Sequence, residues 1–152
     1  MAGAPHLDLG NYLPYLLNRV GFAMVTSFTG TIAPHGLSID MWRVLAALSN
    51  NGGQRQVDLA AMTSIDVSTM SRLVTRLVRM GLATRSRSEK SSREVVVALS
   101  PKGRALVVRL IPVALELERI ASGGIGAKDM AVVKRALRKI YDNMANSSMV
   151  KR

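Results

Sequence analysis

The fold of this chain is decided by residues 66–81, which read DVSTMSRLVTRLVRMG. Placed on a helical wheel at about 100° per residue, the apolar side chains of this stretch fall inside one arc of roughly 160°. That arc holds Val67, Met70, Leu73, Val74, Leu77, Val78 and Met80. The opposite arc is polar and holds Ser68, Thr69, Ser71, Arg72, Thr75, Arg76 and Arg79. The pattern predicts a helix that buries an aliphatic face and leaves a face of hydroxyl and guanidinium groups in water.

The polar face of this helix has arginines but no carboxylate. Arginine can form two hydrogen bonds to guanine in the major groove of DNA, and small hydroxyl groups can reach phosphates. The alternative is a solvated surface helix, but such a helix usually mixes Glu and Lys so that they pair at i,i+4 spacing. The missing acidic partner therefore favours a helix that reads DNA.

The flanking residues predict a winged helix-turn-helix. Upstream, residues 56–62 have helical spacing, and residues 63–65 form a short turn before Asp66, which is a good N-cap. Downstream, Gly81 suits the position after a helix end. Residues 82–87 and 93–99 are then expected to form two strands, joined by a polar loop at residues 88–92.

Two motifs resemble the MarR (multiple antibiotic resistance regulator) family of transcription factors. They are residues 71–82, SRLVTRLVRMGL, and residues 99–104, LSPKGR, which are similar to the Leu-Thr-x-x-Gly motif that opens the family's next helix. The resemblance implies a DNA-contacting arginine in the wing, here Arg93, with an Asp two residues before it. Ser91 stands in place of that Asp. The ion pair that would orient Arg93 is therefore absent, although the positive charge is retained.

We predict that the helix of residues 66–80 enters the major groove and that the wing lies along the backbone or enters the neighbouring minor groove. Arg72 and Arg76 are the expected base or near-base contacts. Hydroxyl contacts to phosphates or thymine methyl groups are expected from Ser68, Thr69, Ser71 and Thr75. The remaining expected DNA contacts are Arg79 on the helix and Arg85, Arg87, Lys90 and Arg93 in the wing.

The charge of the chain agrees with a polyanionic partner. The 21 basic and 10 acidic residues give a formal net charge of +11. Eleven of the basic residues lie between Arg55 and Arg109, against four acidic ones. Charge alone does not choose between nucleic acid and an anionic membrane. No apolar run is long enough for a membrane span.

The composition also argues against several kinds of site. There is no cysteine and there are two histidines, so we expect no disulfide, no metal site and no cofactor. The N-terminal residues do not resemble an export signal, and we expect a cytoplasmic protein. No paired carboxylates, nucleophile and base, or phosphate-binding glycine loop support an enzyme.

Long apolar-striped helices are predicted on both sides of the winged lobe. They span residues 11–32, 39–49, 101–121 and 127–146. One small domain has little interior for so many apolar stripes, so we expect a second copy of the chain to cover them. The expected organisation is mainly α with a small β-wing in a single domain, residues 1–152. Residues 38–104 form its DNA-binding lobe, and residues 11–33 and 105–146 are dimerisation helices.

Four residues are candidates for a small-molecule site: Tyr15, His35, Trp42 and Arg43. A phenol, an imidazole and a guanidinium near an apolar cleft could orient an aromatic acid or an acyl thioester. The alternative for Trp42 is core packing, and for the others an ordinary surface or interface position. The resemblance implies effectors of this kind between the dimerisation helices and the DNA-binding lobe.

These observations predict a sequence-specific DNA-binding transcriptional regulator that acts as a homodimer on an inverted repeat. The resemblance implies repression and release by a small anionic effector. Two alternatives stay open at this point. The winged helix could bind protein instead of DNA, or the chain could bind DNA constitutively, without a ligand switch.

Overall fold

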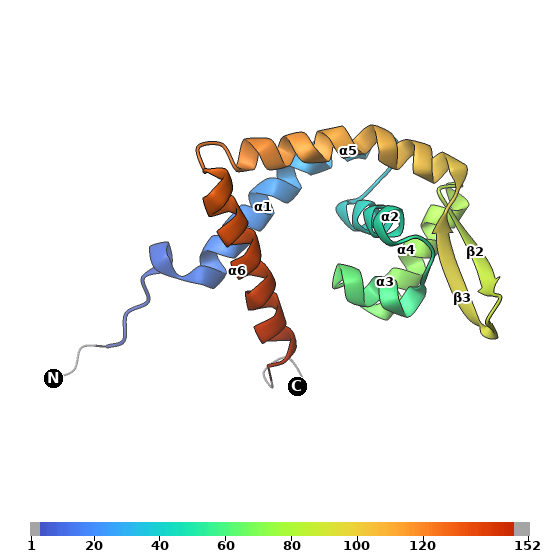
Figure 1. Ribbon diagram of the computed structural model, residues 1–152, viewed down its shortest axis with the longest axis horizontal. Coiled ribbons are helices and arrows are strands. Elements are labelled where there is room, and N and C mark those ends of the chain that lie inside the picture. The colour runs from blue at the N-terminus through green and yellow to red at the C-terminus, as the bar shows by residue number, and fades with distance from the viewer. Residues whose placement is uncertain (1–3, 148–152) are drawn as a thin grey trace. The chain divides into compact units, whose positions relative to one another are not determined.

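A computed structural model describes residues 4–147 of the chain (Figure 1). The elements in order are the short 3-10 helices and the helices and strands η1 Leu9–Asn11, α1 Leu13–Ile32, η2 Ala33–His35, α2 Ile39–Asn51, β1 Gln54–Arg55, α3 Gln56–Thr63, α4 Val67–Arg79, β2 Ala83–Ser88, β3 Ser91–Leu99, α5 Pro101–Ala121 and α6 Ala127–Ala145. The prediction of a mainly α chain with a small β-wing is confirmed. The first helix begins at Leu13 instead of residue 11, and the second continues to Asn51.

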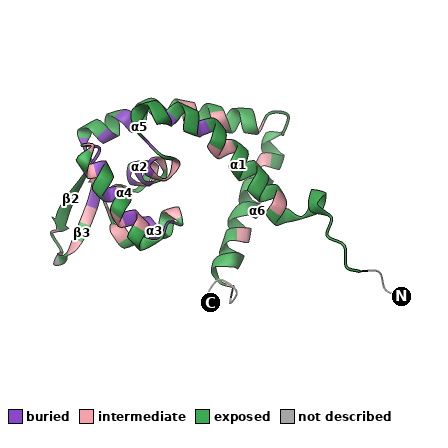
Figure 2. Ribbon diagram, turned by 180° about the vertical axis from the view of Figure 1, so that it is seen from behind, coloured by how far each residue is buried: buried purple, intermediate pink, exposed green. Residues whose placement is uncertain are grey.

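The chain divides into two compact units, residues 1–117 and residues 118–152. The buried core of the described residues lies in the first unit, where α2, α3, α4 and the beginning of α5 contribute most of it (Figure 2). Fully buried side chains include Met41, Leu45, Leu59, Met70 and Leu77. Burial of each such side chain contributes about 1.5 to 3 kcal/mol, so this cluster determines the position of the helix-turn-helix.

The helix-turn-helix forms where it was predicted. Ser38 caps α2 by accepting a hydrogen bond from the Met41 amide at 3.2 Å, and Asp66 caps α4 through the Thr69 amide at 2.9 Å. Between α3 and α4, Ser64 adopts a left-handed conformation with φ of 56°. This residue ends α3 and lets the chain turn within three residues into α4.

The sheet has three antiparallel strands in the order β1-β3-β2. In the wing hairpin, Arg85 pairs with Val97 and Arg87 with Val95, and the turn between β2 and β3 is only Glu89 and Lys90. The sequence predicted two strands and missed β1, in which Arg55 pairs with Val96. A two-residue strand has no alternating pattern to detect, because its position depends on pairing with a distant strand.

The expected apolar faces are partly wrong at their ends. Val57, Met62 and Val67 are exposed, as are Ala105 and Ile120. Val67 is 53% exposed because it opens α4, one turn before the first buried residue, Met70. The stripe of α1 is buried only at Phe28 and Ile32, and its first half is exposed. The described residues of α6 include none that is fully buried.

A tight junction joins the end of α4 to the beginning of α5. Gly81 has φ of 74° and ends α4, and its carbonyl accepts a 2.6 Å hydrogen bond from the Ser100 hydroxyl. The same hydroxyl accepts from the Gly103 amide at 2.9 Å and caps α5. A Cβ at Gly103 would overlap the carbonyl oxygen of Leu82 and lie 2.9 Å from its carbonyl carbon. The sequence 99-LSPKG-103 is therefore explained by a cap and a close backbone contact.

We expect Gly103→Ala to lower the free energy of unfolding by about 1 to 3 kcal/mol, because the added methyl group must push Leu82 away from α5. The matched control is Gly30→Ala in α1, where a Cβ meets nothing within 4 Å. It should be neutral or raise the free energy of unfolding by roughly 0.5 to 1 kcal/mol. Urea unfolding at equal protein concentration measures both, and equal effects would contradict the assigned contact.

Candidate nucleic-acid interface

The exposed face of α4 forms one wall of a groove of about 720 Å³. Arg72, Thr75, Arg76 and Arg79 line it, and Ser71 lies half-buried at its edge. Gly36 and Met80 complete the lining, so no carboxylate is among the lining residues. The predicted helix residues are thus brought together on one accessible, positively charged surface, with Arg72 donating to the Thr69 hydroxyl at 3.3 Å.

Asp66, the acidic residue nearest to this surface in sequence, is used by the helix itself. Its Oδ1 accepts from the Ser68 hydroxyl at 2.6 Å and from the Thr69 amide at 2.9 Å. The hydrogen bond from Ser68, followed by those from Thr69, holds the pKa of Asp66 well below its usual range. The carboxylate therefore caps α4 and stabilises its N-terminus, where a negative charge is favourable.

Arg85 connects the wing to the recognition helix. Its Nη2 donates to the Ser71 carbonyl at 3.1 Å and to the Thr75 hydroxyl at 2.9 Å. The Thr75 hydroxyl in turn donates to the Ser71 carbonyl at 2.9 Å. Arg85 was predicted as a DNA contact, and the structure shows that its guanidinium also joins β2 to α4.

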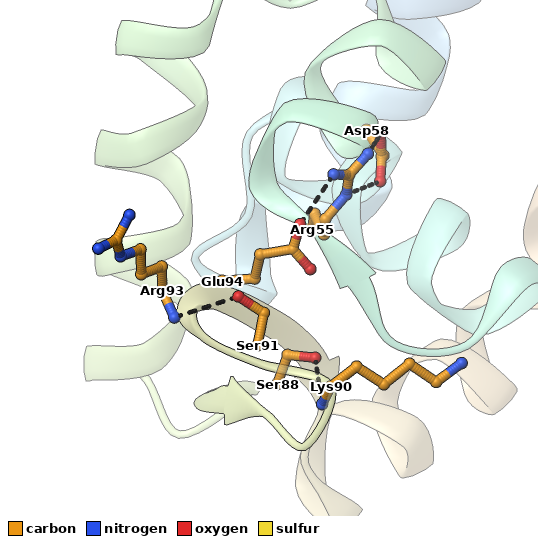
Figure 3. Close-up of polar contacts among 7 residues, drawn as sticks. All are labelled: Arg55, Asp58, Ser88, Lys90, Ser91, Arg93 and Glu94. Atoms are coloured by element: carbon orange, nitrogen blue, oxygen red, sulfur yellow. Dashed lines mark hydrogen bonds and ion pairs between the residues drawn. The ribbon is translucent and has the colours of Figure 1, made fainter.

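The other wing cations lie near the tip of the hairpin. Arg87, Lys90 and Arg93 are exposed. Ser91 accepts from the backbone amide of Arg93 at 3.4 Å, and Ser88 accepts from the amide of Lys90 at 3.1 Å (Figure 3). The Ser91 hydroxyl thus shapes the backbone of the turn, and the Arg93 side chain extends away from it.

Sequence reasoning missed one arginine of this surface, Arg55. Its Nε and Nη2 donate to the two carboxylate oxygens of Asp58 at 2.7 and 3.0 Å, and its Nη1 donates to Glu94 at 3.1 Å (Figure 3). The hydrogen bond from Arg55 lowers the pKa of Asp58, and Asp58, followed by Glu94, raises the pKa of Arg55. The i,i+3 spacing of Arg55 and Asp58 was a detectable signal, but the partner 39 residues away was not.

A polar cavity of about 450 Å³ lies between the helix-turn-helix and the wing. Its lining includes three arginines from different elements, Arg55, Arg85 and Arg93. Ser71 and Glu94 also line it. This arrangement brings the beginning of the recognition helix and the two wing strands around one space of positive charge.

The four ligand candidates do not share one cavity. Trp42 and Arg43 line a space of about 190 Å³ whose other walls are Met24, Val25, Phe28, Ile39, Ala114 and Leu117. Phe28 and Trp42 are tilted rings with centroids 5.4 Å apart. His35 lines a separate cavity, together with Lys102 and Arg109. Tyr15 lies on α1, and its ring is 5.7 Å from the guanidinium carbon of Arg19.

Comparison with known proteins agrees with this geometry. The model of the MarR family matches residues 37–95. The solved structure of BpsR from Bordetella bronchiseptica is 30% identical to the chain and superimposes with a TM-score of 0.81, covering 91% of the chain and 99% of BpsR. The chain belongs to the MarR family. BpsR is described as a protein whose DNA binding is regulated by 6-hydroxynicotinic acid.

Two further MarR-type relatives extend the comparison. The transcriptional repressor NicR of Pseudomonas putida is 30% identical over 103 residues, which are 68% of this chain and 65% of NicR, so the match spans slightly less than two thirds of that repressor. A MarR family regulator from Silicibacter pomeroyi is 27% identical with a TM-score of 0.85, covering 96% of this chain and 97% of that structure.

Membership of the MarR family confirms the predicted winged helix and the class of DNA-binding transcription regulator. MarR regulators are generally not enzymes. Within residues 4–147, no helix is both long and apolar enough to span a membrane.

We expect Arg72→Ala to weaken binding to a selected DNA site by about 1 to 3 kcal/mol, because a guanidinium that bonds to guanine is lost. Binding to random duplex should weaken less, and binding assays at one salt concentration compare the two. Arg109→Ala, which removes the same charge from α5 and outside the groove of α4, is the control. Equal weakening of specific and random binding by Arg72→Ala would assign Arg72 to a phosphate instead.

Proposed function

We propose that the chain is a transcriptional repressor that reads an inverted repeat in DNA as a homodimer. The observation that carries the proposal is the exposed face of α4, where Arg72, Arg76 and Arg79 lie together without a carboxylate among the groove residues. The half-sites would lie about one helical turn apart, ~10 bp from centre to centre. The wing cations Arg87, Lys90 and Arg93 would lie along the backbone or in the adjacent minor groove.

Exposed apolar side chains support the homodimer. On α1 they include Leu13, Leu16, Leu17 and Val20, and on α6 Val133, Leu137, Tyr141 and Met144. Isolated helices of this length are marginal in water, so such faces require a covering surface. The proposed organisation is one domain, with residues 38–104 as DNA-binding lobe and residues 11–33 and 105–146 as dimerisation helices. Such a repressor would act in the cytoplasm, without catalytic activity.

The dimer is expected to be stable at micromolar concentration, with twice the chain mass of 16.4 kDa. Sedimentation equilibrium measures the mass directly. Leu137→Glu, which places a charge on the apolar stripe of α6, should shift the equilibrium toward the monomer. Lys139→Glu on the same helix provides an introduced glutamate at a residue that does not belong to the stripe. A wild-type monomer would contradict the proposed assembly.

A small aromatic carboxylate is the proposed effector. The cavity of about 190 Å³ is below the range usual for drug-sized ligands, which favours a single-ring compound. Phe28 and Trp42 offer aromatic walls, and Arg43 offers a cation, at present paired with Asp40 at 2.9 Å. The regulation of BpsR by 6-hydroxynicotinic acid supports this ligand class.

In a thermal-shift assay, we expect 6-hydroxynicotinic acid or a related aromatic acid to raise the melting temperature and to weaken DNA binding. Arg43→Ala should abolish most of the shift, because the carboxylate loses its counter-charge. His35→Ala should leave the shift intact, because His35 lines a different cavity. The opposite result would move the site to the cavity of His35, and no shift with any acid would support a constitutive DNA-binding protein.

A further inference from the structure

Arg55 occupies a position at which arginine is unfavourable. It is the N-cap residue of α3, and its side chain makes no capping hydrogen bond. Ser, Thr, Asp and Asn are preferred at this position because their oxygens accept from the first amides of the helix. A long cation at the N-terminus of a helix also opposes the helix dipole. Arg55 therefore requires another role in this chain.

The contacts of Arg55 join three elements. Its backbone belongs to β1, where it pairs with Val96 of β3. Its guanidinium binds both carboxylate oxygens of Asp58 on α3 and one oxygen of Glu94 on β3. Glu94 is two residues from Val96, so Arg55 and Glu94 lie on the same face of the sheet as diagonal neighbours. The three residues thus connect the beginning of the helix-turn-helix to the returning strand of the wing.

The position of Glu94 links this contact to Arg93. The two residues are adjacent on β3, and Figure 3 shows their side chains leaving the strand on opposite sides. Fixing Glu94 against Arg55 therefore restricts the strand that carries Arg93. Arg85 makes the equivalent connection from β2, through Ser71 and Thr75 of α4. Each strand of the wing is joined to the helix-turn-helix by one arginine.

Charge makes the presence of Glu94 informative. Carboxylates on a DNA-binding lobe repel phosphates, so Asp58 and Glu94 should weaken DNA binding if charge were their only effect. Arg55 would also be available to phosphates if they did not bind it. We propose that Arg55, Asp58 and Glu94 are positioning residues that hold the wing, and with it Arg93, at a fixed distance from the recognition helix. This inference rests on the proposed function.

The sign of one substitution tests the inference. Glu94→Ala and its control Glu89→Ala remove the same charge and the same atoms from the wing. Glu89 lies in the turn, and within residues 4–147 it forms no ion pair or hydrogen bond through its side chain. Charge alone predicts that both variants bind DNA more tightly. Positioning predicts that Glu89→Ala gains affinity for the selected site, whereas Glu94→Ala loses about two- to fivefold, the range usual for exposed ion pairs.

Random duplex provides the second readout, since nonspecific binding depends mainly on charge. Both variants should bind random duplex at least as tightly as the wild type, so that only Glu94→Ala reduces the ratio of specific to random affinity. In a chain that already carries Arg55→Gln, the loss caused by Glu94→Ala should disappear, because the partner is gone. Urea unfolding of each variant checks that the fold is retained.

The outcomes separate this inference from the proposed function. Equal gains of affinity for Glu94→Ala and Glu89→Ala on the selected site would overturn the positioning role and leave a DNA-binding regulator. A loss of Glu94→Ala that persists in the Arg55→Gln background would also overturn it. A wild-type protein that binds no duplex better than another would instead remove the proposed function.

Discussion

The hydrogen bond from the Ser100 hydroxyl to the Gly81 carbonyl closes the base of the wing. Residues 82–99 form a hairpin between its two partners, so this bond fixes where the recognition helix ends and where α5 begins. Leu82 is held at the same point, because its carbonyl accepts from the Ser100 amide at 3.1 Å and lies against Gly103. The wing therefore projects from a closed junction, and its orientation depends on contacts farther along the strands.

Arginines supply those contacts, and this explains how a strongly basic lobe keeps a defined shape. Like charges on neighbouring elements repel one another and would separate the wing from the helix-turn-helix. Arg55 avoids this by binding two carboxylates, and Arg85 by donating to a carbonyl and a hydroxyl of α4. The cations of the groove, Arg72, Arg76 and Arg79, remain on the exposed surface.

The sequence predicted the elements whose causes are local. The boundaries of α3, α4 and α5 follow from Asp66, Gly81 and Ser100, because caps and left-handed glycines act within a few residues. It did not predict β1 or the contact of Arg55 with Glu94, because both depend on residues about 40 positions apart. The ligand candidates were separated for the same reason: Trp42 and Arg43 are neighbours in sequence, but His35 turns toward residues of α4 and α5.

Helix α2 places the two sites of this regulator in mechanical contact. Met41, Val44 and Leu45 are buried in the core that supports α4, whereas Trp42 and Arg43 line the small cavity. A ligand that prefers one position of α2 must therefore act on the packing beneath the recognition helix, because a close-packed interior transmits small displacements. The coupling is reciprocal, so DNA that selects one arrangement of α4 also changes the affinity of the cavity for its ligand. A single helix shared by core and cavity is thus sufficient for an effector to control DNA binding without touching DNA.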